Sequence, residues 1–148
     1  KNKKIFILGA GGVVPSIIFA LNKMEVSKII VSNRTEKKAK DLKDQFKNID
    51  VVEWGRSQEC DVIINATSLG LNNETIDFDF SNNLNNKLFY DVIYNPSESN
   101  FLKEAKKFGH RAENGKLMFI YQAFEAFRLW HNVEPNITKE TFKLLKND

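Results

Sequence analysis

The sequence predicts an α/β fold built on one doubly wound, mainly parallel sheet with helices on both faces. Short apolar runs alternate along the chain with longer segments that carry apolar residues at three-and-four spacing, which is typical of strand–helix–strand units. The apolar runs lack strict apolar/polar alternation, as expected for strands buried on both sides. With 148 residues, of which 42% are hydrophobic, the chain fits a single domain over residues 1–148.

The predicted elements follow one another in regular order. Strands are expected at residues 3–8, 28–31, 50–53, 61–64 and 88–92, with a sixth, short strand near 110–112. Helices are expected at 13–23, 36–47, 98–108, 116–131 and 138–146, and the last two are assigned to the same domain. Pro15 is compatible with the first helix because it falls in the first turn. The polar, Asn-rich segment 72–86 is expected to form an irregular loop.

A glycine-rich turn, Gly9-Ala10-Gly11-Gly12, comes directly after the first predicted strand. Gly9 and Gly11 fill the first two positions of the G-x-G-x-x-G/A pattern of Rossmann-type dinucleotide sites, and Val14 stands in the third. Small residues at such a turn let backbone N–H groups and the helix N-terminus approach a pyrophosphate. The alternative is a tight strand-to-helix turn without a ligand. The surrounding strand and helix pattern favours the dinucleotide site.

The end of the second predicted strand carries Asn33-Arg34-Thr35 and no acidic residue. A site for NAD usually has a carboxylate there, which binds the 2'-hydroxyl of the ribose. An Arg at the same place accommodates a 2'-phosphate instead. The sequence therefore predicts NADP as the cofactor.

Three further strings follow the later strands. Asn65-Ala66-Thr67-Ser68 offers small side chains and free backbone groups, although a polar turn would look the same. Tyr94 follows the fifth strand and is either a site residue or a buried structural Tyr. Gly115 indicates a close backbone approach, and Met118 and Gln122 share one face of the next helix, where a Met is more often part of a core. Because the carboxyl ends of parallel strands lie at one edge, these strings are candidates for a common site.

Composition and patterning argue against several other functions. A net charge of only +3, with lysines and acids interspersed between residues 36 and 47, is typical of a solvated helix face and not of a nucleic-acid site. A single cysteine, Cys60, excludes an internal disulfide, and His110 and His131 lie too far from other ligands in the sequence to indicate a metal. The apolar run after the N-terminal lysines is interrupted by glycines and Pro15, so no secretory leader or membrane span is expected and a cytoplasmic location is predicted.

Five strings follow one another along the chain: Gly9-Ala10-Gly11-Gly12, Asn33-Arg34-Thr35, Asn65-Ala66-Thr67-Ser68, Asp91-Val92-Ile93-Tyr94-Asn95-Pro96, and Asn114-Gly115 through Trp130. In this order they resemble the NADP-binding domain of the shikimate dehydrogenase family, and the resemblance extends over essentially the whole chain. The resemblance implies reversible reduction of 3-dehydroshikimate to shikimate with NADPH, in the biosynthesis of aromatic amino acids. Val13, Val14 and Pro15 depart from the family, which often has small residues and an Arg after the glycines.

The resemblance also implies roles for individual residues. Tyr94 and Gln122 match positions that contact the substrate, and Lys38 completes the family string N-R-T-x-x-[RK]. The residues that match cofactor-binding positions are Gly9, Ala10, Gly11, Gly12, Val13, Asn33, Arg34, Thr35, Lys38, Asn65, Ala66, Thr67, Ser68, Val92, Gly115 and Met118. The catalytic Lys and its partner Asp are expected in an N-terminal substrate domain outside this chain. We therefore assign no catalytic residue and expect the chain to bind cofactor without turnover.

Three alternatives remain open at this point. The first is a quinate/shikimate dehydrogenase paralogue, for which an acid beside Asn33 would favour NAD. The second is the related nucleotide-binding domain of glutamyl-tRNA reductase, which pairs a glycine turn with a similar Asn-Arg-Thr string but matches Tyr94 and Gln122 poorly. The third is a non-catalytic Rossmann module that senses redox state or binds a partner. The sequence does not distinguish a monomer from a homodimer.

Overall fold

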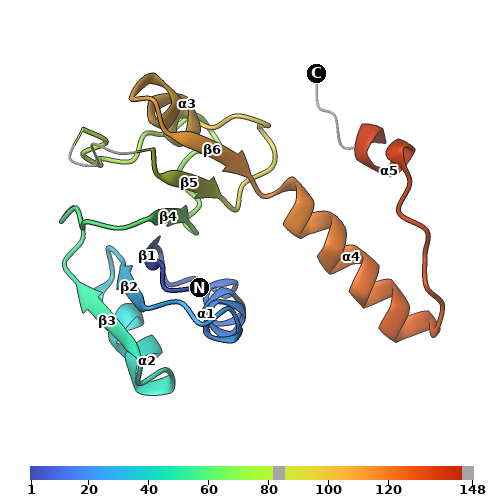
Figure 1. Ribbon diagram of the computed structural model, residues 1–148, viewed down its shortest axis with the longest axis horizontal. Coiled ribbons are helices and arrows are strands. Elements are labelled where there is room, and N and C mark those ends of the chain that lie inside the picture. The colour runs from blue at the N-terminus through green and yellow to red at the C-terminus, as the bar shows by residue number, and fades with distance from the viewer. Residues whose placement is uncertain (82–85, 145–148) are drawn as a thin grey trace.

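The structure, a computed structural model, describes residues 1–81 and 86–144 and contains one six-stranded, all-parallel sheet (Figure 1). The strand order is β3-β2-β1-β4-β5-β6. Their bounds are Lys4–Leu8 for β1, Lys28–Ser32 for β2, Ile49–Val52 for β3, Val62–Asn65 for β4, Leu88–Asp91 for β5 and Arg111–Asn114 for β6. This order is that of a doubly wound dinucleotide-binding fold, so the predicted fold class is confirmed.

The register aligns the ends of the strands. Leu8 of β1 pairs with Ser32 of β2 and with Asn65 of β4, and β4 and β5 then pair Asn65 with Asp91. The chain leaves β1 toward β2 on one side, whereas β4 continues the sheet on the other side. The turns that follow β1, β2, β4 and β5 therefore meet at one edge, beside the point where the winding direction reverses. In open α/β sheets this is where ligands bind.

One face of the sheet is covered by α1 (Val14–Lys23) and α2 (Glu36–Gln45). Alternate residues of the strands point to the two faces, so Ile5 and Ile7 pack under these helices, together with Val14 and Ile18 of α1. Both predicted helices are confirmed, with α1 starting one residue later and α2 ending two residues earlier than expected.

The opposite face is covered by α3 (Asn100–Lys107) and by an irregular segment that carries Phe78 and Phe80. The ring of Phe78 lies 6.2 Å from that of Phe6, 5.9 Å from that of Phe89 and 6.5 Å from that of Phe101, centroid to centroid. We call Phe6, Phe78, Phe80, Phe89 and Phe101 the aromatic cover. Part of the predicted loop 72–86, residues 82–85, lies outside the described residues.

The third helix and the sixth strand also differ from their predicted bounds. The α3 helix begins at Asn100 and not at 98 because the Ser99 side chain accepts a hydrogen bond from the Leu102 N–H and caps it. The predicted sixth strand starts one residue later and ends two residues later than expected, at Arg111–Asn114. The last two helices are α4 (Lys116–His131) and α5 (Lys139–Leu144), and residues 145 and 146 of the predicted final helix are not described.

The α4 helix leaves the end of β6 and points away from the sheet, and after its far end the chain turns back so that α5 lies alongside α4 (Figure 1). Along α4 only Ile120 is buried, whereas Leu129 and Trp130 are 70% and 79% exposed. No helix in the described part of the chain is long and apolar enough to cross a membrane.

Candidate functional site

The glycine turn after β1 is held against the turn after β4. Gly9 has a φ of +113°, and its N–H donates to the Ser32 carbonyl at 2.7 Å. A Cβ atom on Gly9 would lie 2.7 Å from the Ala66 carbonyl oxygen, whereas one on Gly12 would meet nothing within 4 Å. Gly9 is thus required by the fold itself, and Gly12 leaves open space where a ligand could approach.

The N-terminus of α1 begins directly after this turn and has no side-chain cap. The first N–H groups of a helix have no partner within it, so an anion can bind them. Val14, which stands where dinucleotide sites have Gly or Ala, is fully buried in the core, and Pro15 lies at the start of the helix. Val14 thus contributes to the core, and Pro15 occupies a first-turn position where its missing N–H costs no helical hydrogen bond.

Asn33 ties the end of β2 to the glycine turn. Its Oδ1 accepts from the Ala10 N–H at 3.1 Å, and its Nδ2 donates to the Thr35 carbonyl at 2.9 Å. With both ends of its amide occupied, Asn33 positions its neighbours. Arg34 and Lys38 are exposed, and neither makes an ion pair within residues 1–81 and 86–144.

Two adjoining hollows lie along this edge of the sheet, and together we call them the edge groove. The β2-side hollow has a volume of about 280 Å³ and the β5-side hollow about 560 Å³. The first is lined by Gly9, Ala10, Gly11, Asn33, Arg34, Lys38, Trp54, Ala66, Thr67 and Ser68. The second is lined by Gly11, Gly12, Val13, Ala66, Thr67, Ser68, Leu71, Val92, Ile93, Tyr94 and Asn95. The shared residues make the groove continuous, and most of the predicted cofactor residues line it.

Asn65, the last residue of β4, is the exception within the string 65–68, because it is fully buried beneath the groove. Its Oδ1 accepts from the N–H and hydroxyl of Thr67, at 3.0 and 2.7 Å. Its Nδ2 donates to the Leu69 carbonyl and to the Asp91 carboxylate, at 3.1 and 3.0 Å. Asn65 therefore shapes the 66–69 turn from below and does not line the groove.

Asp91 is also fully buried, at the end of β5. Its carboxylate accepts from Asn65 Nδ2, from the Ile93 N–H at 3.0 Å and from the Ser99 hydroxyl at 2.5 Å. Burial raises the pKa of Asp91, and the three hydrogen bonds act in the opposite direction. This carboxylate connects β4, β5 and α3, and it is enclosed too deeply to exchange protons with a ligand in the groove.

Gly115 lies against the backbone of Val92, and a Cβ atom there would be 2.1 Å from the Val92 carbonyl oxygen. The Gly115 N–H donates to the Ile93 carbonyl at 3.1 Å. Gly115 thus supports the floor of the β5-side hollow from behind. This agrees with the close backbone approach that the sequence indicated.

The predicted substrate residues do not meet in this structure. Tyr94 lines the β5-side hollow, and its ring stacks on that of Phe119 at 4.4 Å between centroids. Gln122 is exposed on α4. Met118, predicted as a cofactor residue, lines a separate apolar hollow of about 440 Å³, together with Ile17 and Tyr90. The path of α4 away from the sheet separates these two residues from the groove.

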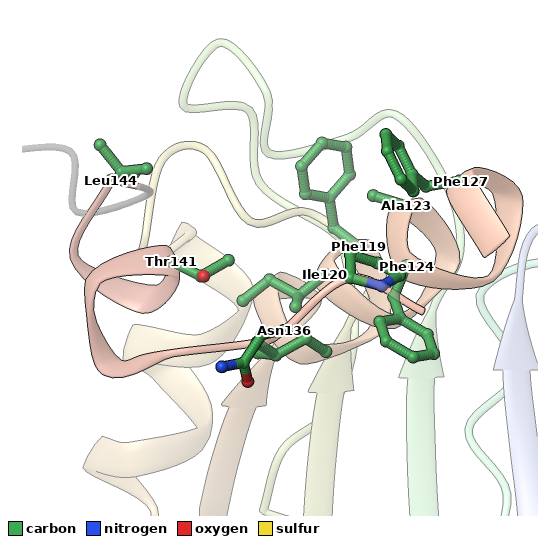
Figure 2. A pocket seen from close by; sticks show the side chains of 10 residues that line it. Phe119, Ile120, Ala123, Phe124, Phe127, Asn136, Thr141 and Leu144 are labelled. Carbon is green, nitrogen blue, oxygen red and sulfur yellow. The ribbon is translucent and has the colours of Figure 1, made fainter. Parts of the chain in front are cut away.

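A further hollow of about 380 Å³ lies between α4 and residues 135–144 (Figure 2). Phe119, Phe124 and Phe127 dominate its lining, which contains no acid, base or nucleophilic cysteine. No group of three or more potential metal ligands occurs in the described ranges of the chain. The edge groove, with its uncapped helix N-terminus and the exposed cations Arg34 and Lys38, is therefore the candidate site.

Comparison with known sequences identifies the family. A profile described as Shikimate / quinate 5-dehydrogenase matches residues 1–91, and one described as Shikimate 5'-dehydrogenase C-terminal domain matches residues 117–139. The chain is 55% identical over 146 residues to shikimate dehydrogenase (NADP(+)) of Pelagibacter ubique, covering 98% of this chain and 55% of that protein. It spans about half the length of the relatives that it matches.

Two solved structures share the fold. The shikimate 5-dehydrogenase of Thermus thermophilus, solved in complex with NADP(H) and shikimate, matches with a TM-score of 0.79 and 29% identity, over 91% of this chain and 51% of that one. Quinate dehydrogenase from Corynebacterium glutamicum, solved in complex with NAD, matches with a TM-score of 0.84 and 30% identity, over 97% and 56%. On the profile match, the chain belongs to the shikimate / quinate 5-dehydrogenase family.

Proposed function

We propose that this chain is the C-terminal, NADP-binding domain of a shikimate dehydrogenase, which interconverts 3-dehydroshikimate and shikimate. The observation that carries the proposal is the lining of the β2-side hollow, which includes Arg34 and Lys38 and no carboxylate. A 2'-phosphate would pair with these cations, whereas the 2'-hydroxyl of NAD calls for an acid. The names of the Pelagibacter and Thermus relatives support the same cofactor.

The edge groove suits an extended dinucleotide. The pyrophosphate would bind the N–H groups at Gly11, Gly12 and Val13, where the open space at Gly12 and the uncapped α1 N-terminus favour an anion. The nicotinamide would lie in the β5-side hollow, toward Val92 and Tyr94. When bound, NADPH supplies the hydride that reduces the substrate carbonyl. The chain's own part is to hold the cofactor in place, with Asn33 and Asn65 bracing the turns that contact it.

We further propose that substrate binding requires more than this chain. Tyr94 is the one predicted substrate residue that faces the groove, and Gln122 and Met118 would join it only through another placement of α4. The Lys and Asp that transfer the proton are assigned to the half of the relatives that this chain does not span. The chain alone is therefore expected to bind NADP and to show no turnover.

Calorimetric titration of the chain with NADP and NAD tests the proposal. Preference for NADP is expected, and Arg34→Ala should weaken NADP binding by about 1–3 kcal/mol while changing NAD binding little. Arg111→Ala is the matched control, because Arg111 is exposed on β6, the outermost strand on the side of the sheet away from β2 and β3. Preference for NAD would favour a quinate dehydrogenase, and equal losses of both cofactors in Arg34→Ala would refute the role of Arg34.

A further inference from the structure

Trp54 lies two residues after the end of β3, at the same edge of the sheet as the glycine turn. It lines the β2-side hollow with Arg34 and Lys38. It also lines a second, polar hollow of about 690 Å³, which Arg34 shares. Trp54 and Arg34 thus stand together at the boundary between the two hollows.

The side chain of Trp54 is only partly buried, and part of it packs against the core cluster that contains the aromatic cover. That packing restrains the indole while the remainder borders the groove. A restrained aromatic ring is a good platform for a planar base, because little conformational entropy is lost on binding. Tryptophan also offers the largest π-face of any side chain for stacking on a base.

We propose that Trp54 binds the adenine ring of the dinucleotide by stacking, in the hollow that it shares with Arg34 and Lys38. The inference rests on the proposed function, since it concerns the cofactor of that same site. It divides the recognition between two side chains. Trp54 reads the base, which NADP and NAD have in common, and Arg34 reads the 2'-phosphate, which only NADP has.

The chain offers a matched control for fluorescence, because its only other tryptophan is Trp130, 79% exposed on α4. In Trp130→Phe, Trp54 is the sole tryptophan, and adenosine 2',5'-bisphosphate is expected to quench its emission. In Trp54→Phe, the same compound should leave the emission of Trp130 unchanged. The affinity of Trp130→Phe for NADP should equal that of the wild type.

Affinities provide the second readout. Trp54→Leu should lose about 5- to 100-fold in affinity for NADP, for NAD and for adenosine 2',5'-bisphosphate alike. Trp54→Phe, which keeps an aromatic ring, should retain most of the wild-type affinity. Thermal unfolding without ligand separates this effect from packing, because a merely structural role would lower the melting temperature of Trp54→Leu and leave the affinity of its folded form intact.

Wild-type affinity of folded Trp54→Leu for all three compounds would overturn the inference and leave Trp54 as a packing residue. If Trp54→Leu does not fold, the Trp130→Phe titration decides, and bound adenosine 2',5'-bisphosphate without any change in Trp54 emission overturns it equally. If the wild-type chain binds none of the compounds, the proposed function fails and the inference fails with it. These outcomes are distinguishable in one set of titrations.

Discussion

Substituting Gly9 by Ala tests whether the glycine turn is fixed by the protein or by its ligand. At φ +113° an L-residue is strained by about 1–3 kcal/mol. The new Cβ would lie 2.7 and 2.8 Å from the carbonyl oxygen and carbon of Ala66, which are backbone atoms and cannot rotate away, and relieving such overlap costs about 1–3 kcal/mol more. Gly9→Ala is therefore expected to lower the free energy of unfolding by about 2–6 kcal/mol.

Urea denaturation followed by circular dichroism measures this loss, and the melting temperature should fall by roughly 6–18 °C at about 3 °C per kcal/mol. Gly12→Ala is the control, since its Cβ meets no atom within 4 Å and its φ is not left-handed. That variant should be as stable as the wild type or up to about 1 kcal/mol more stable. Its NADP affinity should nevertheless fall, because the methyl group occupies the proposed pyrophosphate site. A Gly9→Ala protein within about 0.5 kcal/mol of the wild type would refute the reasoning.

The remaining predictions concern the buried interior of the protein and the cofactor end of the site. Asp91→Ala should lower the free energy of unfolding by about 3 kcal/mol, since it leaves buried donors such as Asn65 Nδ2 without this acceptor, and Asp91→Asn by less. Because the folded pKa of Asp91 is raised above its unfolded value near 3.8, its protonated form stabilises the fold at low pH and that contribution is lost as pH rises through the folded pKa. In denaturation at several pH values, the free energy of unfolding of Asp91→Asn should therefore rise relative to that of the wild type as pH increases. A difference between the two proteins that does not change with pH would contradict this. Burial raises the pKa of Cys60 to about 12, so the native thiol should resist a disulfide reagent at pH 8 and react after unfolding, whereas fast native labelling would show that the side chain is accessible. Asn33→Asp places a carboxylate beside the proposed ribose site and should reduce the ratio of the affinities for NADP and NAD by about tenfold or more in calorimetry. An unchanged ratio would show that the choice of cofactor does not depend on this position.

Most of the fold could be predicted from the sequence, because its strands are apolar runs and its helices carry regular apolar spacing. The bounds of the edge strand β6 were predicted least well, because Arg-Ala-Glu-Asn gives no apolar signal and the pairing of β6 with β5 decides where the strand begins and ends. The aromatic cover was missed. Residues 76–80 alternate apolar and acidic side chains, a pattern that could have indicated a segment with one face on the core.

The sequence predicted which residues form the site better than it predicted what each of them does. The strings after β1, β2, β4 and β5 converge as expected, because parallel strands end at one edge. Asn33 and Asn65 brace backbone turns, which depends on hydrogen-bond partners that no spacing reveals. Trp54 belongs to no motif, and a lone Trp after a strand suggests a core residue. The direction of α4, which separates Met118 and Gln122 from the groove, depends on tertiary packing, such as the stacking of Phe119 on Tyr94, that sequence spacing does not reveal.

The aromatic cover also has a consequence for the order in which the chain folds. Phe78 contacts rings from β5 and α3, which follow it closely in the sequence, and from β1, which lies far before it. The irregular segment that carries Phe78 cannot gain all of these contacts until those elements have assembled, and closing the long loop back to β1 is slow. Substitutions in the cover should therefore accelerate unfolding more than they retard folding. The same segment would be the first to expose its rings when the domain is heated, making it the starting point for aggregation.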